Sequence, residues 1–276
     1  MKYIGILIIF FVSLQLVAQP YTGDSWAKVK SAGSGTLTIV YYSQPGLIVK
    51  EDGKMKGVCV EILSDFVKFV ETKYGKKVKL NYAGEEKVFS GFLTTVQTTP
   101  NILGVTNVTV TDERKKLMKF TPSFLTNPIV MITHKDAPSI KDLTEMKTAF
   151  ATYTAEMITG STHVKHMEDI KKKYYPGMKI TFGPSGSVIL DHIRANPKLF
   201  TILDFTEFMD AMRNQLPVKR QNVEITKAEE LAFIMAPQTD WDVLWKEFLT
   251  DEYKASVRYR KIVVDHLGAS FLSVVR

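Results

Sequence analysis

Short β-rich runs alternate with amphipathic helical patterns along this chain, and the alternation constrains its fold more than any other feature. The run TLTIVYY (36–42) predicts a strand, and the segment 57–74 has a helical apolar period that ends at Gly75. The first half is also expected to hold a strand at 78–82, a helix at 89–96 and a strand at 101–110. Such an alternation favours mainly parallel sheets joined by right-handed crossovers.

The same pattern starts again after Pro128, which predicts a second α/β unit. Strands are expected at 129–134, 148–152, 179–182 and 201–203. Helices are expected at 139–145, 160–175, 188–196 and 205–215. The apolar run 229–236 is expected to cross back to the first unit as a further strand.

No long Pro- or Ser-rich linker separates the two units, so short strands near 124–128 and 229–233 are expected to connect them. Two such connections form a hinge rather than a flexible tether. We therefore predict two α/β lobes, with lobe 1 at 19–124 and 233–276 and lobe 2 at 128–229.

The first 18 residues, MKYIGILIIFFVSLQLVA, place one Lys before an apolar run that Ser13 and Gln15 interrupt. The run is too short and too broken for a membrane span, and Ala18 offers a small residue for cleavage. We predict a secretory signal peptide at 1–18 and a periplasmic mature protein. The remaining 258 residues (276 minus 18) are enough for two lobes with separate cores.

The composition argues against several classes of function. The net charge of +7 falls to +6 without Lys2, and the basic residues are dispersed among acids, so nucleic-acid binding is not expected. The single Cys59 excludes an intrachain disulfide and is expected to be a small buried hydrophobe. His163 and His166 share a helical spacing without a third ligand, so we expect them to be exposed and expect no metal and no cofactor.

The segment GVTNVTVTDERKKLMKFTPSF (104–124) carries the strongest functional signal. Its valines alternate with small polar residues, which is typical of a strand, and Thr111 then supplies an N-cap for a helix with acids in its first turn. Free backbone N–H groups at 109–112 and the guanidinium of Arg114 would suit a planar carboxylate. The alternative is a surface helix on which Arg114 pairs with an adjacent acid.

Residues 109–124 (TVTDERKKLMKFTPSF) resemble the segment by which the periplasmic solute-binding proteins of family 3 are recognised, the amino-acid receptors of ABC importers. The resemblance extends to GTLTIV (35–40), EDGKMKGVCVEIL (51–63) and 231–268. It implies a type II periplasmic-binding-protein-like fold of two α/β lobes joined by a two-strand hinge. In that family a Thr and an Arg bind the α-carboxylate, so the resemblance implies this role for Thr109 and Arg114.

The resemblance also implies a contribution from the second lobe. The turn Gly160-Ser161-Thr162 is similar to one whose amides and hydroxyl receive the same carboxylate, which a helix N-terminus can do. Asp204 follows an apolar strand at the edge where open α/β sheets gather ligands, and the resemblance implies that it binds the ligand's ammonium group. By position alone, the turn and Asp204 would also serve as ordinary N-caps.

The walls of the site are expected from Tyr42, after the first strand, and Phe89, at the start of a helix, although such aromatics more often belong to a core. The chain also departs from the family pattern. Asn107 stands where the family usually has Gly, Cys59 replaces a common acid, and 153–159 is interpreted as an insertion before the second-lobe turn. These departures leave open a non-standard amino acid, or an organic acid without an amine.

Together these features predict a periplasmic solute-binding protein without enzymatic activity, expected to be a monomer. It would capture a polar amino acid or related carboxylate by hinge closure and present it to the membrane subunits of an ABC importer. The main alternative is an enzyme similar to the periplasmic cyclohexadienyl dehydratases, with Glu156 or Asp204 as general acid or base. A receptor that modulates a membrane sensor is a third interpretation.

Overall fold

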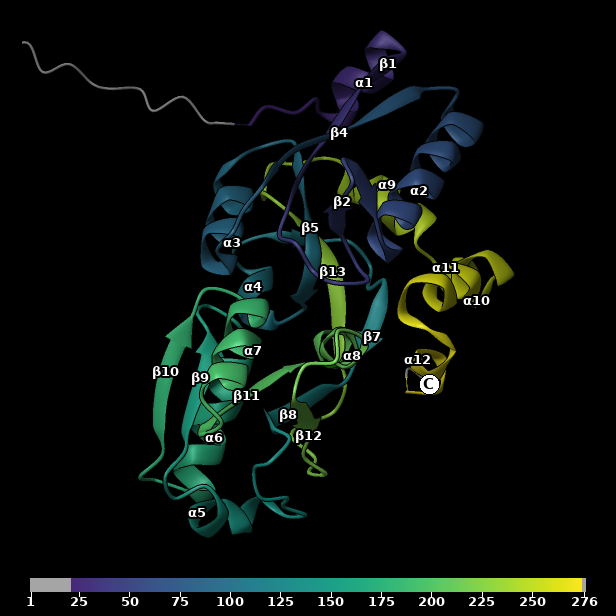
Figure 1. Ribbon diagram of the computed structural model, residues 1–276. Coiled ribbons are helices and arrows are strands. Elements are labelled where there is room, and N and C mark those ends of the chain that lie inside the picture. Colours follow the sequence, from purple (N-terminus) through teal and green to yellow (C-terminus); the bar gives the residue numbers. More distant parts are fainter. Residues whose placement is uncertain (1–20, 275–276) are drawn as a thin grey trace, which may run out of the picture.

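The computed structural model describes residues 21–274, so the predicted signal peptide at 1–18 lies outside the described residues. The described chain forms two α/β lobes, one above the other in Figure 1, with a narrow waist between them. Each lobe is built on its own sheet. No helix within 21–274 is long and apolar enough to cross a membrane.

The first lobe is built on a mixed sheet with a parallel centre. Its strands, in spatial order, are β4 (Lys77–Glu85), β1 (Ser34–Tyr41), β5 (Ile102–Thr109), β13 (Glu229–Met235) and β6 (Lys119–Phe120). β1 is parallel to both β4 and β5, as the alternation of strands and helices predicts, and β13 is antiparallel to β5. The late strand β13 therefore completes a sheet that the N-terminal half begins.

Helices from both ends of the sequence surround this sheet, and a short hairpin lies beside it (Figure 1). The hairpin strands are β2 (Val49–Glu51) and β3 (Lys54–Lys56). The helices are α1 (Trp26–Ala32), α2 (Val58–Tyr74), α3 (Phe89–Thr98), α4 (Asp112–Lys115), α9 (Asp242–Phe248), α10 (Asp251–Ala255), α11 (Val257–Leu267) and α12 (Ala269–Val274). Phe66 of α2 stacks on Trp245 of α9 with ring centroids 3.9 Å apart, and Cys59 is fully buried as expected.

The two connections between the lobes pair with each other. β7 (Leu125–Asn127) runs antiparallel to the start of β13, with Glu229 opposite Asn127 and Leu231 opposite Leu125. The chain then enters the second sheet at Ile129. The two-strand hinge of the predicted fold class is therefore present, while the residue limits that we gave for the lobes remain a prediction.

The second lobe has a five-stranded sheet in the order β10 (Lys179–Gly183), β9 (Thr154–Ile158), β11 (Leu199–Asp204), β8 (Ile129–His134) and β12 (Val218–Arg220). β9 is parallel to β10 and β11, whereas β8 is antiparallel to β11 and β12. The accompanying helices are the 3-10 turn η1 (Leu143–Glu145), α5 (Met146–Ala149), α6 (His163–Tyr174), α7 (Gly186–Ala195) and α8 (Phe205–Arg213).

The prediction of a strand at 148–152 is wrong. Those residues end α5 and form a turn, in which Phe150 packs against Tyr153 with ring centroids 5.1 Å apart. The strand is β9, between β10 and β11, and four of its five residues are buried. Residues 153–159 are thus no insertion but contain a central strand. Ala155 and Glu156 are residue types depleted in strands, so packing within the sheet identifies this segment as a strand.

The loop 44–48 is held against the start of α2. Val58 N donates to Gly46 O at 3.0 Å, and Cys59 N donates to Leu47 O at 2.9 Å. Gly57 has a φ of 121°, and a Cβ atom there would lie 2.3 Å from Leu47 O. Glycine is therefore required at position 57, where the backbone positions the loop.

Replacing Gly57 by Ala should lower the free energy of unfolding by about 2–4 kcal/mol, because strained φ and backbone overlap add. Urea denaturation of the purified protein measures this change. Gly53 is the matched control, since it also has positive φ (76°) but no atom lies within 4 Å of its hypothetical Cβ. Gly53→Ala should cost only about 1 kcal/mol, and equal costs at the two positions would contradict the steric argument.

Candidate functional site

A small pocket lies between the two lobes at the waist. The first lobe lines it with Tyr42, Gln44, Phe89, Asn107, Thr109 and Arg114, and the second with Ile158, Ser161, Thr162, His163, Asp204 and Glu207. The cavity has a volume of about 20 Å³, close to what one water molecule needs. The lobes are therefore closed on each other.

The structure brings together eight of the residues that the sequence predicted for the site, whereas Tyr41 and Ser43, also expected beside the cleft, do not line the pocket. Those eight residues are Tyr42, Phe89, Asn107, Thr109, Arg114, Ser161, Thr162 and Asp204. The remaining four lining residues, Gln44, Ile158, His163 and Glu207, were not predicted as ligand-binding. The structure shows that these side chains line the same pocket, and their roles in ligand binding remain proposals.

Arg114 is a buried cation in this pocket, with 9% of its surface exposed. Its Nη1 donates to Thr109 O at 3.0 Å, and its Nη2 donates to Gly160 O of the second lobe at 3.1 Å. No acidic side chain of the described residues lies within 4.0 Å of it, so the expected alternative of a surface ion pair is wrong. Arginine has five N–H donors, so the guanidinium keeps donors for a carboxylate.

The turn before α4 agrees with the sequence in part. Thr111 caps the helix, since its Oγ1 accepts from Arg114 N at 3.2 Å. The expectation that the amides of this turn are free is wrong for Val110, whose N donates to Glu230 O at 2.9 Å. The pairing of β5 with β13 continues past the end of β5, and the sequence of residues 104–124 gives no sign of that partner.

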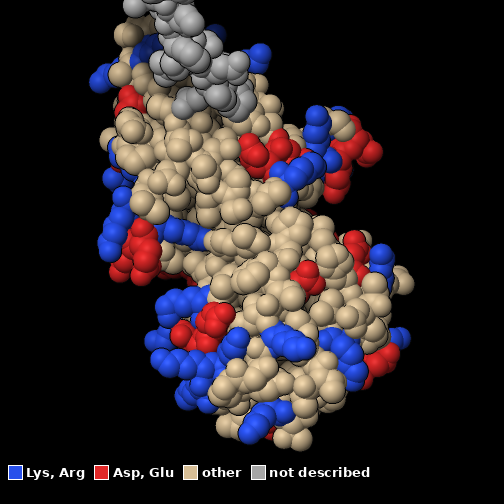
Figure 2. Space-filling view, turned by 90° about the vertical axis from the view of Figure 1, so that its left-hand side faces the viewer, with Lys and Arg blue, Asp and Glu red and all other residues tan. Residues whose placement is uncertain are grey.

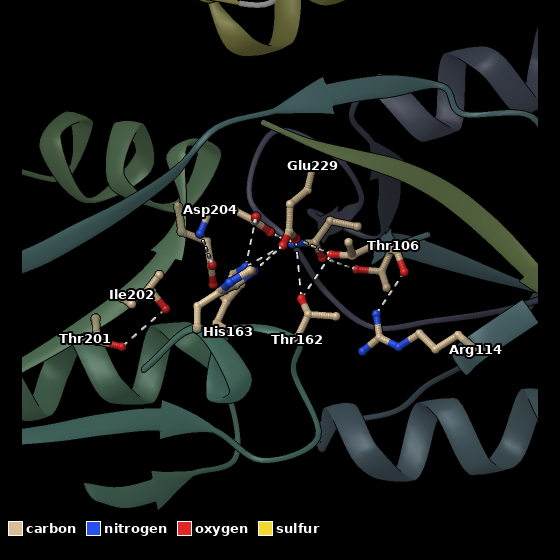
Figure 3. A network of polar contacts seen from close by, with 12 residues as sticks. Thr106, Arg114, Thr162, His163, Thr201, Ile202, Asp204 and Glu229 are labelled. Carbon is tan, nitrogen blue, oxygen red and sulfur yellow. Dashed lines mark hydrogen bonds and ion pairs between the residues drawn. The ribbon is translucent and has the colours of Figure 1, made fainter. Parts of the chain in front are cut away.

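Two threonines that were predicted to receive a ligand carboxylate contact a carboxylate of the chain itself (Figure 3). Thr109 Oγ1 donates to Glu229 Oε2 at 2.6 Å, and Thr162 Oγ1 lies 3.4 Å from the same oxygen. His166 Nε2 lies 2.8 Å from Glu229 Oε1. This cluster of Thr109, Thr162, His166 and Glu229 joins β13 of the first lobe to α6 of the second.

Glu229 is held as an anion by these contacts. Burial acts to raise its pKa, but the hydrogen bond with His166, the charge of His163 and the hydrogen bond from Thr109 outweigh burial and lower the pKa to about 2. Its carboxylate is therefore ionised at neutral pH and occupies the two hydroxyls. A ligand carboxylate would have to share or replace it there.

Asp204 ends β11 immediately before α8 and is 3% exposed. One carboxylate oxygen accepts from the Asn107 amide of the opposite lobe, and His163 Nε2 lies 3.6 Å from the other, Oδ1. Oδ1 has no hydrogen-bond partner among the described residues. Burial raises the pKa of Asp204, and the charge of His163 acts against this. Asp204 thus offers an acceptor to any cationic group in the pocket.

Glu207 is a second buried carboxyl, in the first turn of α8, and is 4% exposed. Burial and then the nearby charge of Asp204 raise its pKa to about 8, and the Gln44 amide offsets this only in part. Sequence reasoning missed it, although its spacing of three residues from Asp204 places both acids at the same end of the helix. At neutral pH this carboxyl is mostly protonated.

The expectation that His163 and His166 are exposed is wrong for His163, whereas the His166 side chain is partly exposed (26%). His163 is 5% exposed, lines the pocket, and lies between Asp204 and Glu229, at 3.6 and 3.8 Å from their oxygens. Their helix was interpreted as a solvated, charged one, but closure of the lobes covers its first turn. No group of three or more His, Cys, Asp or Glu within 21–274 is arranged to hold a metal ion.

Glu156, a candidate general acid of the enzyme alternative, does not line the pocket. It points from β9 to His192 of α7, whose Nδ1 lies 2.9 Å from Glu156 Oε1. Of the two candidate general acids or bases, Glu156 and Asp204, it is Asp204 that faces the pocket.

Aromatic side chains form one wall. Tyr42 meets Phe89 edge to face with centroids 5.4 Å apart, and the Arg114 guanidinium lies 5.7 Å from the centre of the Phe89 ring. Outside the pocket a wider groove continues between the lobes, and Lys115, Lys165 and Lys227 contribute to its lining. Figure 2 shows the hollowed waist with basic side chains gathered at one side of it.

The sequence pattern that defines the bacterial extracellular solute-binding proteins, family 3, matches residues 37–228. The chain belongs to this family. Members of family 3 are extracellular by that description, and the two-lobed α/β architecture around an interlobe pocket is the fold expected for it.

Individual relatives are more distant. The "Probable amino-acid-binding protein YxeM" of Bacillus subtilis (strain 168) is 29% identical over 119 residues, which span 43% of this chain and 40% of that relative. The arginine-, lysine-, histidine-binding protein ArtJ of Geobacillus stearothermophilus has a TM-score of 0.67 at 16% identity, over 84% of this chain and 95% of that chain. An ancestral arginine-binding protein bound to glutamine has a TM-score of 0.65 at 20% identity, over 84% and 98%. These solved structures establish the shared fold.

Replacing Glu207 by Gln should stabilise the ligand-free protein at high pH. Because the folded pKa of about 8 lies above the ordinary 4.5, folding is penalised increasingly as pH rises from about 4.5 to 8. The free energy of unfolding of the variant should therefore equal that of wild type near pH 4.5 and exceed it by a few kcal/mol at pH 8. Urea denaturation across this range tests it, with Asp191→Asn on α7 as control, since Asp191 is an exposed acid paired with Arg194. A pH-independent difference would contradict the assignment.

Replacing Glu229 by Gln should destabilise the protein in the opposite pH window. The folded pKa of about 2 lies below the ordinary 4.5, so this group stabilises the fold above pH 4.5 and less as pH falls towards 2. We expect a loss of about 1–3 kcal/mol at pH 6, which shrinks by pH 3. Chemical denaturation at both pH values measures it, and an undiminished loss at pH 3 would refute the ionic role.

Proposed function

We propose that this protein is a periplasmic solute-binding protein that holds an α-amino acid between its lobes and presents it to the membrane subunits of an ABC importer. One observation carries the proposal. Arg114, buried without an acid partner, and Asp204, whose Oδ1 has no hydrogen-bond partner among residues 21–274, face the same interlobe pocket. A cation and a carboxyl with a free acceptor in one pocket match the two charged groups of a zwitterion.

The roles follow from the geometry of the side chains. Arg114 would bind the α-carboxylate, together with the hydroxyl of Ser161, which has no hydrogen-bond partner among the described residues. Asp204, oriented by the Asn107 amide, would bind the α-ammonium group. Thr109 and Thr162 would join the carboxylate site once their contacts with Glu229 loosen. Tyr42 and Phe89 would form the wall beside the ligand's side chain.

Hinge motion is part of this proposal. An amino acid is several times larger than the single water molecule for which the pocket has room, so the lobes have to separate before it enters. Separation would break the contact of Arg114 with Gly160 and that of Glu229 with His166. Ligand contacts made only in the closed form would then favour closure.

We also propose that the protein has no catalytic activity, acts as a monomer, and loses residues 1–18 on export. The lobes would be 19–124 with 233–276, and 128–229. Relatives described as amino-acid-binding or arginine-binding proteins support the class of ligand. Turnover of a cyclohexadienyl acid by the purified protein would favour the dehydratase alternative instead.

Arg114 is the side chain on which binding should depend most. A thermal-shift screen of the 20 L-amino acids and small organic acids should identify a ligand that raises Tm, since a ligand at 100 times its Kd stabilises by about 2.7 kcal/mol. Arg114→Ala should abolish that rise, and Arg114→Lys should reduce it, because lysine keeps the charge but lacks the planar fork.

Lys115→Ala provides the control, since Lys115 is the exposed neighbour on α4 and makes an ion pair with Asp112. It should leave the ligand-induced rise intact. An unchanged rise in both Arg114 variants, or no rise with any amino acid or carboxylate, would refute the proposed function.

A further inference from the structure

Glu207 is a second buried carboxyl of the pocket. The α-carboxylate and α-ammonium groups of a bound amino acid would pair with Arg114 and Asp204, and Glu207 would be left without a partner. It lies in the first turn of α8, three residues after Asp204, and is 4% exposed. No basic side chain of the described residues lies within 4.0 Å of it. Glu207 closes a capping box with Asp204, but a capping box needs no counter-ion-free buried acid, since a glutamine serves equally well. Burying a carboxyl without a counter-ion is costly, so the choice of an acid here points to a further role.

Both lobes enclose this carboxyl. Asp204 N donates to Glu207 Oε2 at 3.4 Å, and the other oxygen, Oε1, packs on Gly186 at the start of α7, where a Cβ atom would lie only 1.8 Å from it. Gln44 and Tyr42 approach from the first lobe, and burial and then the charge of Glu207 raise the pKa of the Tyr42 phenol. Glu207 is thus held at one end of the pocket.

The charges around the pocket show what remains once a zwitterion is bound. Its acids are Asp204, Glu207 and, at its edge, Glu229. Glu229 already contacts His166 and Thr109. A ligand ammonium would satisfy Asp204, and a ligand carboxylate would satisfy Arg114. Glu207 is then the acid left over.

We propose that Glu207 binds a positively charged group on the ligand's side chain, so that the site selects cationic amino acids such as L-lysine and L-arginine. This inference rests on the proposed function, because it takes the ligand to be an amino acid held by Arg114 and Asp204. It assigns to Glu207 a specificity that the two backbone-binding residues do not provide.

The selectivity has a simple physical origin. A neutral side chain leaves Glu207 protonated and able to offer one ordinary hydrogen bond, whereas an ammonium or guanidinium group allows it to ionise and form a charge-assisted pair. An acidic side chain would add repulsion to the same end of the pocket. We therefore expect cationic ligands to bind best, neutral ones less well and acidic ones worst.

The aromatic wall fits the rest of such a side chain. Tyr42 and Phe89 meet edge to face, with the Tyr42 ring near Glu207. Lysine and arginine carry apolar stems that pack on such surfaces while their charged ends reach an acid. At one end of the pocket, an apolar wall thus leads to an acidic side chain.

Matched ligands separate the side-chain charge from everything else. Isothermal titration should compare L-lysine with L-norleucine, which lacks the terminal ammonium, and L-arginine with neutral L-citrulline. Each cationic ligand should bind roughly 10- to 100-fold more tightly than its neutral counterpart, as expected for a charge-assisted hydrogen bond. A ratio near one for both pairs would overturn the inference.

Proton release provides an independent signature. Glu207 is mostly protonated at pH 7 in the free protein, so L-lysine binding should release a proton, detected by titration in buffers of different ionisation enthalpy. The affinity ratio of lysine to norleucine should rise by up to about ten-fold per pH unit between pH 6 and 8. Asp204, His163, Glu229, Arg114 and Tyr42 face the same pocket, but their titration affects both ligands and cancels in the ratio.

Variants then assign the effect to one side chain. Glu207→Gln should still bind amino acids but lose both the cationic preference and the proton release. Asp191→Asn, which removes an exposed acid of α7 that pairs with Arg194, should keep both. If Glu207→Gln retains the preference, the inference fails.

The outcomes also distinguish this inference from the function on which it rests. Binding of neutral or acidic amino acids without cationic preference would refute the role of Glu207 and leave the amino-acid receptor standing. Failure of every amino acid to bind to wild type, Arg114 intact, would refute both.

Discussion

A guanidinium buried between two lobes without an acid beside it is the constraint on which the closed arrangement depends. Burial alone lowers the pKa of Arg114, and the more distant charges of Glu229 and Asp204 act in the opposite direction. Two backbone carbonyls, one from each lobe, supply its hydrogen bonds. Carbonyls solvate a cation but do not neutralise it, so closure keeps an unpaired charge out of water. In the proposed function, a carboxylate that arrived with the ligand would remove that penalty.

The acids and hydroxyls around Arg114 follow the same logic. Thr109 and Thr162 are never without a carboxylate in the closed form, because Glu229 stands beside them. This internal carboxylate keeps both hydroxyls hydrogen-bonded in the closed form. At these two threonines, entry of the proposed ligand would exchange one carboxylate for another, whereas Arg114 and Ser161 would offer donors that are free.

The sequence predicted much of this site because its signals are local. The strand, cap and helix around Arg114 lie in one continuous segment, and Asp204 follows directly from an apolar strand. What it could not predict are contacts between the lobes. Glu207 and His163 are buried in the first turns of their helices, and Glu207 packs on Gly186 of its own lobe as well as facing Gln44 of the first lobe. β9 was missed for a related reason, since Ala155 and Glu156 weaken its strand preference and it is identified as a strand by its neighbours in the sheet.

The strand order of the first lobe has a consequence for how the chain is assembled. β13 pairs with β5, about 120 residues earlier, whereas the second sheet takes all of its strands from 129–220. Native pairings between distant segments form slowly, so the continuous second lobe should acquire its structure before the first lobe can close its sheet. Until then, the edge of β5 that pairs with β13 would remain unpaired and exposed. Since β13 also carries Glu229 and one arm of the hinge, the last step of folding would complete the first sheet, the hinge and the binding cleft together.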